Sequence, residues 1–325
     1  MANISKAGYF KAIKASKSKH LSSFLLSATP QSLWTAKRSA YGRTPPRFPS
    51  LPGAETPHQM NKVLLDHFFP PNEPFSRRLR VRPYKKERPL TKHEIATALS
   101  KCSPTSAPGP DRNPYCIWKR VNQINQSVLL EILSPLVSLG YHSASLKGSN
   151  GILLNQVGKP SYESPALSRI IVLIRTISKI LERIIASRLL LVPRSKGLLH
   201  PNQCGSLPGL STYDAVLTVF NDVRTLQRPC LKVSSHSLDV KAGFDNVDNS
   251  TLARMLREGG IPPYLVSWVS SFLGERSCTL GFQGPPGTPA PGNVGAPRGS
   301  PISLLLFLLY VAPLHFRIPR GLLIS

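Results

Sequence analysis

The sequence predicts an α+β fold, because helices and short strand candidates gather around an aspartate-bearing turn without a repeating strand–helix pattern. The helical signal is clearest over 175–190, RTISKILERIIASRLL, where apolar residues recur on one face. The stretch 237–248, SLDVKAGFDNVD, instead indicates the end of a strand, a turn and the start of a helix. At 325 residues and 41% hydrophobic content, the chain can form one large domain or two ordinary ones.

Residues 1–88 are expected to form a basic, loosely organised connector. The first 54 residues contain no Asp or Glu and many serines, a composition that suits an organellar transit peptide or a basic linker that contacts nucleic acid. Prolines in the stretch 43–52, RTPPRFPSLP, and at Pro70–Pro71 break any regular element. We favour the linker.

The remainder, 89–325, is predicted to be one domain in which helices alternate with loops. Thr91 and Glu94 form a capping box that begins a helix reaching about Lys101. The stretch 106–113, SAPGPDRN, is a turn or loop, and 281–299, rich in Gly and Pro, is a loop or hairpin. Further helices share an apolar stripe of helical period: Ser127–Leu139, Arg175–Leu190, Thr251–Glu258 and Pro262–Leu273. Pro135 lies inside the first of these, where a proline kinks or ends a helix.

The net charge of +25 and the pI near 10.4 indicate an anionic partner, most simply nucleic acid. The five cysteines form no Cys-x-x-Cys pair, so neither a zinc site nor a disulfide framework is indicated. The longest apolar run, Ile302–Val311, has about half of the roughly 20 residues that cross a bilayer, so no membrane partner is expected.

Three aspartates stand close together in SLDVKAGFDNVD, in a chain with only 16 acidic residues. Asp239 falls at the expected strand end, where a carboxylate is well placed to bind Mg²⁺ with waters and substrate phosphates. On spacing alone a structural interpretation stays open, in which Asp248 or Asn249 caps the next helix and the other aspartates are surface charges.

The stretch SLDVKAGFDNVD resembles motif A of reverse transcriptases, in the form typical of non-LTR (LINE-like) retrotransposons. Four other blocks resemble segments of that family in the same order: 106–115 (SAPGPDRNPY), 158–189 with Gly158-Lys-Pro160 and the long helix, 203–215 (QCGSLPGLSTYDA), and 295–314 (GAPRGSPISLLLFLLYVAPL), which is similar to motif B. The resemblance implies a partial polymerase right hand, with fingers over about 89–200, an incomplete palm over about 201–325 and no thumb.

The resemblance also implies RNA-directed DNA polymerisation with Mg²⁺, an RNA template, a DNA primer and dNTP substrates. Asp239 would be the catalytic, metal-binding aspartate, and the main-chain carbonyl of Val240 a second metal ligand. Phe244 would lie under the sugar of the incoming nucleotide and exclude a 2′-hydroxyl. The other implied nucleotide-binding residues are Arg169 and Lys159 at the triphosphate, and Gly299, Ser300 and Pro301 in a turn beneath the nascent base pair. Asp245 and Asp248 would be structural.

Several positions depart from the family's pattern. Arg112 stands in place of a glycine, and Ala242-Gly243 has the inverse of the usual order. The family supplies its other carboxylates from a later Tyr/Phe-x-Asp-Asp motif, but no Asp-Asp pair occurs in this sequence. We therefore expect a truncated, inactive fragment of a longer polyprotein, nuclear if expressed. The alternatives are a non-enzymatic nucleic-acid-binding remnant and a product that does not fold stably.

Overall fold

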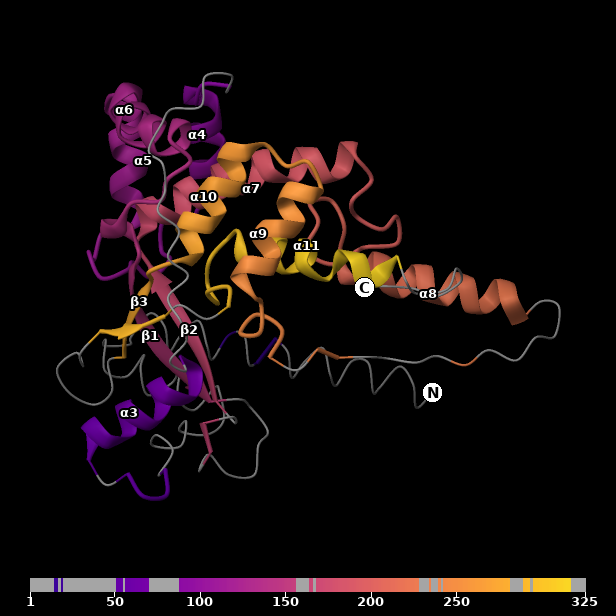
Figure 1. Cartoon of the computed structure of the whole chain (residues 1–325), viewed down its shortest axis with the longest axis horizontal. Coiled ribbons are helices and arrows are strands. Elements are labelled where there is room, and N and C mark those ends of the chain that lie inside the picture. The colour runs from indigo at the N-terminus through magenta and orange to yellow at the C-terminus, as the bar shows by residue number, and fades with distance from the viewer. Residues whose placement is uncertain are drawn as a thin grey trace.

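A computed structural model describes residues 15–16, 19, 51–54, 56–69, 88–155, 164–165, 168–227, 234, 239–240, 242–280, 289–292 and 295–316. Within these residues a cluster of helices packs above a small mixed sheet, and one further helix lies beneath it (Figure 1). The predicted mixture of helices with a non-repeating sheet is therefore found. The predicted site residue Lys159 lies outside the described residues.

The sheet has the strand order β2-β1-β3-β4. Strand β1 (Gly148–Asn155) pairs antiparallel with β2 (Ser168–Ile174) and parallel with β3 (Ser277–Leu280). The two-residue strand β4 (Ala290–Pro291) pairs antiparallel with β3, so the hairpin predicted for this Gly- and Pro-rich region is confirmed at its base. Strand β2 is an edge strand, and its free edge becomes important at the candidate site.

The predicted helices are confirmed to within a few residues. Pro135 stays inside a continuous helix, and the N–H of Leu139 donates to its carbonyl at 2.9 Å. The described helices are α3 (Pro57–Phe68), α4 (Lys92–Ser100), α5 (Tyr115–Ile124), α6 (Gln126–Ser138), α7 (Thr176–Ser195), α8 (Thr212–Gln227), α9 (Asn249–Glu258), α10 (Pro263–Leu273) and α11 (Ser303–His315).

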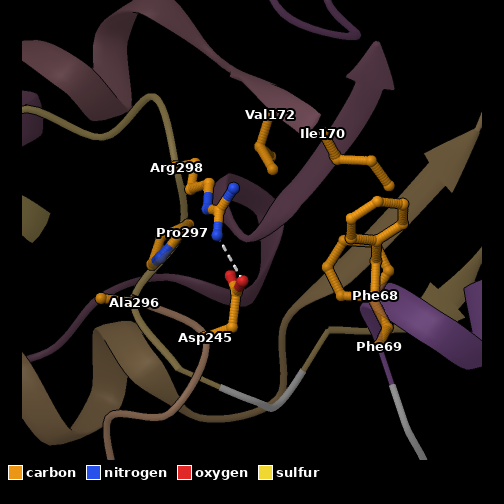
Figure 2. A pocket seen from close by; sticks show the side chains of 8 residues that line it. All are labelled: Phe68, Phe69, Ile170, Val172, Asp245, Ala296, Pro297 and Arg298. Carbon is orange, nitrogen blue, oxygen red and sulfur yellow. Dashed lines mark hydrogen bonds and ion pairs between the residues drawn. The ribbon is translucent and has the colours of Figure 1, made fainter. Parts of the chain in front are cut away.

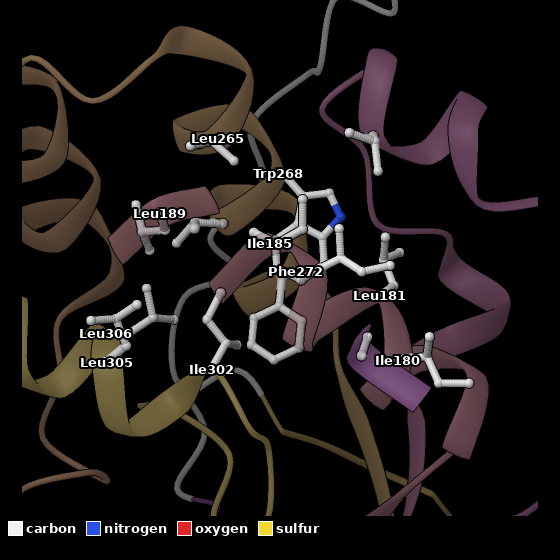
Figure 3. Packing of buried hydrophobic residues seen from close by; sticks show 14 of the residues in the cluster. Ile180, Leu181, Ile185, Leu189, Leu265, Trp268, Phe272, Ile302, Leu305 and Leu306 are labelled. Atoms are coloured by element: carbon white, nitrogen blue, oxygen red, sulfur yellow. The ribbon is translucent and has the colours of Figure 1, made fainter. Parts of the chain in front are cut away.

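Helix α7 is the centre of the main core. Its apolar face, which includes Ile180, Leu181 and Ile185, is fully buried in a cluster to which α4, α10 and α11 also contribute (Figure 3). On α10 the rings of Trp268 and Phe272 stack with their centroids 5.2 Å apart. Glu182, which the helical pattern places off the apolar face, is nevertheless fully buried, a difference explained by its contacts described below.

Helix α4 is tied to α7 by a partly buried ion pair. Thr91 and Glu94 form the predicted capping box, with the Thr91 hydroxyl accepting from the Glu94 N–H. The same Glu94 carboxylate accepts from Arg188 Nε at 2.7 Å and from its Nη2 at 2.9 Å. Burial alone would raise the pKa of Glu94, but the hydrogen bonds from Arg188 and Thr91 outweigh it and hold the pKa below its usual value.

Part of the connector is ordered, unlike the loose organisation predicted for 1–88. Helix α3 begins with a capping box between Thr56 and Gln59 and buries Leu64. It packs on one face of the sheet, against a small core that includes Ile170 and Val172 of β2. The physical reason is that β2 alternates buried and exposed residues, and the buried set needs an apolar cover.

Helix α8 projects from the body and exposes an apolar stripe (Figure 1). Tyr213, Val216, Leu217 and Phe220 follow the i, i+3, i+4, i+7 spacing of a core-facing surface, yet they are between 40% and 69% exposed. Among the described residues, this stripe therefore lacks the layer that such a pattern normally packs against. None of the described helices is both long and apolar enough to cross a membrane.

We predict that Glu94→Gln lowers the free energy of unfolding by about 1–3 kcal/mol at pH 7, because glutamine keeps the capping box but not the charge that pairs with Arg188. A carboxylate with a lowered folded-state pKa stabilises the fold above its unfolded pKa of about 4.3 and loses that contribution below it. The difference between wild type and variant, measured by urea unfolding, should shrink from pH 7 to pH 3. A difference that is constant with pH would contradict the ion pair's role.

Candidate functional site

The loop 106–113 is fixed against the junction between β2 and α7. A Cβ at Gly109 would lie 2.5 Å from the Arg175 nitrogen, so only glycine allows this approach. The Thr176 hydroxyl donates to the Asn113 carbonyl at 2.6 Å and accepts from the Trp118 indole at 2.7 Å. The loop therefore holds the start of α7, and through it the end of the edge strand.

Residues 295–302, which we call the glycine turn, run along the free edge of β2. The Val172 N–H donates to the Arg298 carbonyl at 2.9 Å, which satisfies one group of the unpaired edge. Gly299 has φ +109°, and a Cβ there would lie 2.6 Å from the Val172 carbonyl oxygen. Gly299 is thus needed for a close approach to strand β2, while the predicted approach to the nascent base pair stays a prediction.

The glycine turn is also held from its buried side. The Ser300 hydroxyl donates to Glu182 at 2.5 Å and accepts from the Ile302 N–H at 3.3 Å. Pro301 is half-buried and lies just ahead of α11. The three residues predicted to form a turn, Gly299 to Pro301, do so between an edge strand and the first turn of a helix.

Residues 242–246, which we call the aspartate turn, pack on the glycine turn. The Ala296 N–H donates to the Phe244 carbonyl at 2.8 Å, and the Phe244 ring lies 5.0 Å from the ring of Phe307 on α11, tilted by 31°. Two sequence blocks that are about fifty residues apart are thereby joined, and Phe244 is brought to the glycine turn.

An ion pair completes this contact. Arg298 Nη2 and Asp245 Oδ2 are 2.5 Å apart at the rim of a small pocket (Figure 2). Burial raises the pKa of the Asp245 carboxyl, and the charge and hydrogen bond of Arg298 oppose that rise. The pocket is lined by Phe68, Phe69, Ile170, Val172, Asp245, Ala296, Pro297 and Arg298.

The structural role predicted for the last aspartate of the cluster is confirmed. Asp248 is the N-cap of α9, and its carboxylate accepts from the Thr251 N–H at 2.6 Å and from the Ser250 hydroxyl at 2.7 Å. Asp245 is also engaged structurally, although its partner Arg298 was not predicted. No local pattern could have found that pair, because the two residues are 53 positions apart.

The strand predicted to end at Asp239 and Val240 is found at neither of these residues, and its earlier part lies outside the described residues. Asp239 and Val240 belong to no helix or strand and are exposed, while Ser237 and Leu238 lie outside the described residues. A strand needs a paired neighbour, and within the described part of the chain the sheet consists of β1 to β4 only. Asp239 thus lies next to a well-anchored turn without itself being held by a ladder of hydrogen bonds.

Arg169 is exposed on β2, on the strand face that it shares with Ile171. A Cβ at Gly299 would lie 3.6 Å from the Ile171 side chain. Since two strand residues span roughly 7 Å, Arg169 is within about that distance along the strand of the residue that borders Gly299. The structure thus brings Arg169, Phe244 and the glycine turn into one region.

The described residues do not make up a complete magnesium site. No group of three His, Cys, Asp or Glu side chains gathers anywhere in the described ranges. By the resemblance the Asp239 carboxylate and the Val240 carbonyl would be metal ligands, and polymerase chemistry requires two cations about 3.5–4 Å apart. These two groups alone would not hold both cations.

Two residues carry backbone strain. Arg112 stands where the family has a glycine, and Ala242 has exchanged places with the glycine that follows it. Arg112 in the loop 106–113 has φ +55°, and Ala242 in the aspartate turn has φ +51°. This left-handed region costs a residue with a side chain about 1–2 kcal/mol relative to glycine. Gly243, by contrast, has no room for a side chain, since a Cβ there would lie 2.8 Å from the Phe307 ring.

Comparison with known proteins gives a family match over half of the chain. Residues 157–322 match the family described as reverse transcriptase (RNA-dependent DNA polymerase). This range contains Arg169, the aspartate turn and the glycine turn, the same elements that the structure brings together.

The curated relatives are proteins of mobile elements. The chain is 27% identical over 222 residues, 68% of its length, to the probable RNA-directed DNA polymerase from transposon X-element of Drosophila melanogaster. It is 27% identical over 230 residues, again 68% of its length, to a Pol polyprotein from the R2 element of Popillia japonica. It is 23% identical over 240 residues, 73% of its length, to the RNA-directed DNA polymerase from mobile element jockey of Drosophila melanogaster. The matched region spans 24%, 29% and 26% of these relatives, respectively.

We predict that Ala242→Gly raises the free energy of unfolding by about 0.5–1 kcal/mol, because it removes the left-handed strain. Gly243→Ala should lower it by about 1–3 kcal/mol through the clash with Phe307. Urea unfolding followed by tryptophan fluorescence measures both. Equal stability of the two variants would show that the aspartate turn is not held as described.

Proposed function

The chain belongs to the reverse transcriptase (RNA-dependent DNA polymerase) family, and from this premise we propose that it forms the template- and nucleotide-contacting part of an RNA-directed DNA polymerase. Because the chain spans only about a quarter of the length of its relatives, this function is assigned to the part in hand and not to a whole enzyme. RNA template, DNA primer and dNTP are the proposed partners.

One observation carries the proposal: the aspartate turn is clamped to the glycine turn, which in turn is bound to the strand that bears Arg169. A polymerase must hold the triphosphate, the sugar and the templating base of one nucleotide pair at the same time. Residues from three distant parts of the sequence meet here, and the family assigns one of these tasks to each part.

The proposed roles follow that division. Arg169, with Lys159, binds the triphosphate, and the Phe244 ring excludes a 2′-hydroxyl from the sugar site. Gly299, Ser300 and Pro301 support the nascent base pair, where the bare Gly299 backbone permits close approach. Asp239 and the Val240 carbonyl are ligands for Mg²⁺, which when bound stabilises the charge that develops on the transferred phosphoryl group.

We further propose that 89–200 corresponds to fingers and 201–325 to an incomplete palm. The exposed apolar stripe of α8 supports this, because a helix with that pattern is built to cover a sheet. Asp239, which is exposed and belongs to no strand, also supports it. A palm sheet that pairs with the segment around Asp239 would account for both features.

A second candidate function, non-enzymatic nucleic-acid binding, is favoured by the net charge of +25. Lysine and arginine attract phosphate whatever the sequence, so this binding should weaken steeply as salt rises. The two candidates differ in whether the glycine turn takes part. A basic remnant would bind equally well with a distorted turn, whereas a polymerase part would not.

We predict that the 325-residue chain binds primed RNA but does not extend the primer, because its sequence offers no Asp-Asp pair for the second cation. Incorporation of labelled dNTP with Mg²⁺ over a range of enzyme concentrations measures this. Mg²⁺-dependent extension that Asp239→Ala abolishes would overturn the prediction of inactivity while confirming the role of Asp239.

We predict that Gly299→Ala weakens binding of an RNA template with a DNA primer about tenfold at fixed salt, because the new Cβ displaces the turn from Val172. Gly197→Ala is the matched control: it carries the same kind of strain, φ +63°, but meets nothing within 4 Å. Fluorescence anisotropy across a salt series separates this effect from charge. If Gly299→Ala and Gly197→Ala bind alike, the basic-remnant function is favoured instead.

A further inference from the structure

Glu182 is a fully buried carboxylate on helix α7, within the apolar core. Its two oxygens accept hydrogen bonds from two different parts of the chain. Oε1 accepts from the hydroxyl of Ser178, one turn earlier on the same helix, at 2.7 Å. Oε2 accepts from the hydroxyl of Ser300 in the glycine turn at 2.5 Å, across 118 positions of sequence.

These bonds form a directional chain through the core. His142 Nε2 lies 3.3 Å from Ser178 Oγ, and because the single hydroxyl proton of Ser178 is donated to Glu182, this contact requires the tautomer in which Nε2 carries the proton. Ser178 then donates to Glu182, and on the other side Ser300 also donates to Glu182 while accepting from the Ile302 N–H. The carboxylate is thus the common acceptor of the chain.

A buried carboxylate is costly, and burial raises the pKa of Glu182 against the opposing effect of the Ser300 and Ser178 hydrogen bonds. An apolar residue at this position would leave the buried hydroxyls of Ser178 and Ser300 without their acceptor. It could not reproduce the hold on Ser300. The carboxylate therefore specifies the position of the turn.

We propose that Glu182 is a positioning residue that fixes the glycine turn, through Ser300, against the edge of β2. The turn is held on two sides: by the Val172–Arg298 backbone bond at the strand edge and by Glu182 from within the core. Because α7 follows β2 after the single residue Arg175, the strand, the helix and the turn form one rigid corner.

The functional consequence of this positioning role rests on the proposed function. If Arg169 on β2 binds the triphosphate and the glycine turn supports the base pair, Glu182 sets the distance between those two subsites. Glu182 contacts no substrate in this scheme and acts only through Ser300.

Hydrogen exchange read by mass spectrometry tests the positioning role on the full chain. In Glu182→Ala, amides over 298–303 should exchange about tenfold faster, the effect of losing one charged hydrogen bond. A peptide covering α10 should be unchanged. Ser178→Ala is the matched control, because it removes the other donor to the same carboxylate but leaves Ser300 bound, so the turn should keep its protection.

Two further variants keep the test decisive if the alanine variant does not fold. Glu182→Gln retains an oxygen that accepts from Ser300 and should restore protection of 298–303. Ser300→Ala should lose that protection with little disturbance of the core. Unchanged exchange over 298–303 in Ser300→Ala, or an equal increase in every peptide, would overturn the proposal.

Binding of primed RNA separates this proposal from the function on which it rests. A looser turn with weaker binding supports both. A looser turn with unchanged affinity leaves the role of Glu182 standing and contradicts the proposed place of the turn beneath the base pair. An undisturbed turn contradicts the role of Glu182, whatever the affinity.

Discussion

The burial of helix α7 is the constraint on which the remaining structure depends. Ile180, Leu181, Ile184, Ile185 and Leu189 are almost wholly excluded from water, and each contributes roughly 1.5–3 kcal/mol through burial. A hydrogen bond adds a net of only about 1 kcal/mol. The polar ties of this helix therefore add less stability than its apolar face does, but they decide position: Arg188 holds α4, Thr176 holds the loop before α5, and Glu182 holds the glycine turn.

Local signals in the sequence were sufficient for most helices, because apolar period and caps act within one or two turns. The same signals mark α3, where Thr56, Pro57 and Gln59 make a capping box with proline at the first helical position. The neighbouring prolines nevertheless predict a loosely organised segment here. Helix α5 has no side-chain cap, so its start carries no comparable mark. Pro135 shows that an interior proline does not always end a helix. The buried residues before and after it, Leu133 and Val137, keep α6 continuous although one backbone hydrogen bond is missing.

The candidate site was predictable only in part, because its decisive contacts are not local. Gly299 could be assigned from its motif, since its need for space is a property of one residue. Glu182 and Ser300 could not be paired from a helical pattern, which placed the glutamate off the buried face. For the strand expected to end at Asp239, the local pattern is not sufficient either. Its local pattern suits a strand end, but a strand exists only with a neighbour, and no described strand lies beside it.

The strain at Ala242 indicates which of the two turns determines the conformation of the other. A left-handed alanine persists only where its surroundings over-determine the backbone, and the aspartate turn is held by Ala296, Arg298 and Phe307. All three follow it in the sequence by about fifty residues or more. The aspartate turn therefore takes its shape from the glycine turn, which in turn takes its place from β2 and α7. Asp239 stands three residues ahead of this turn in the sequence.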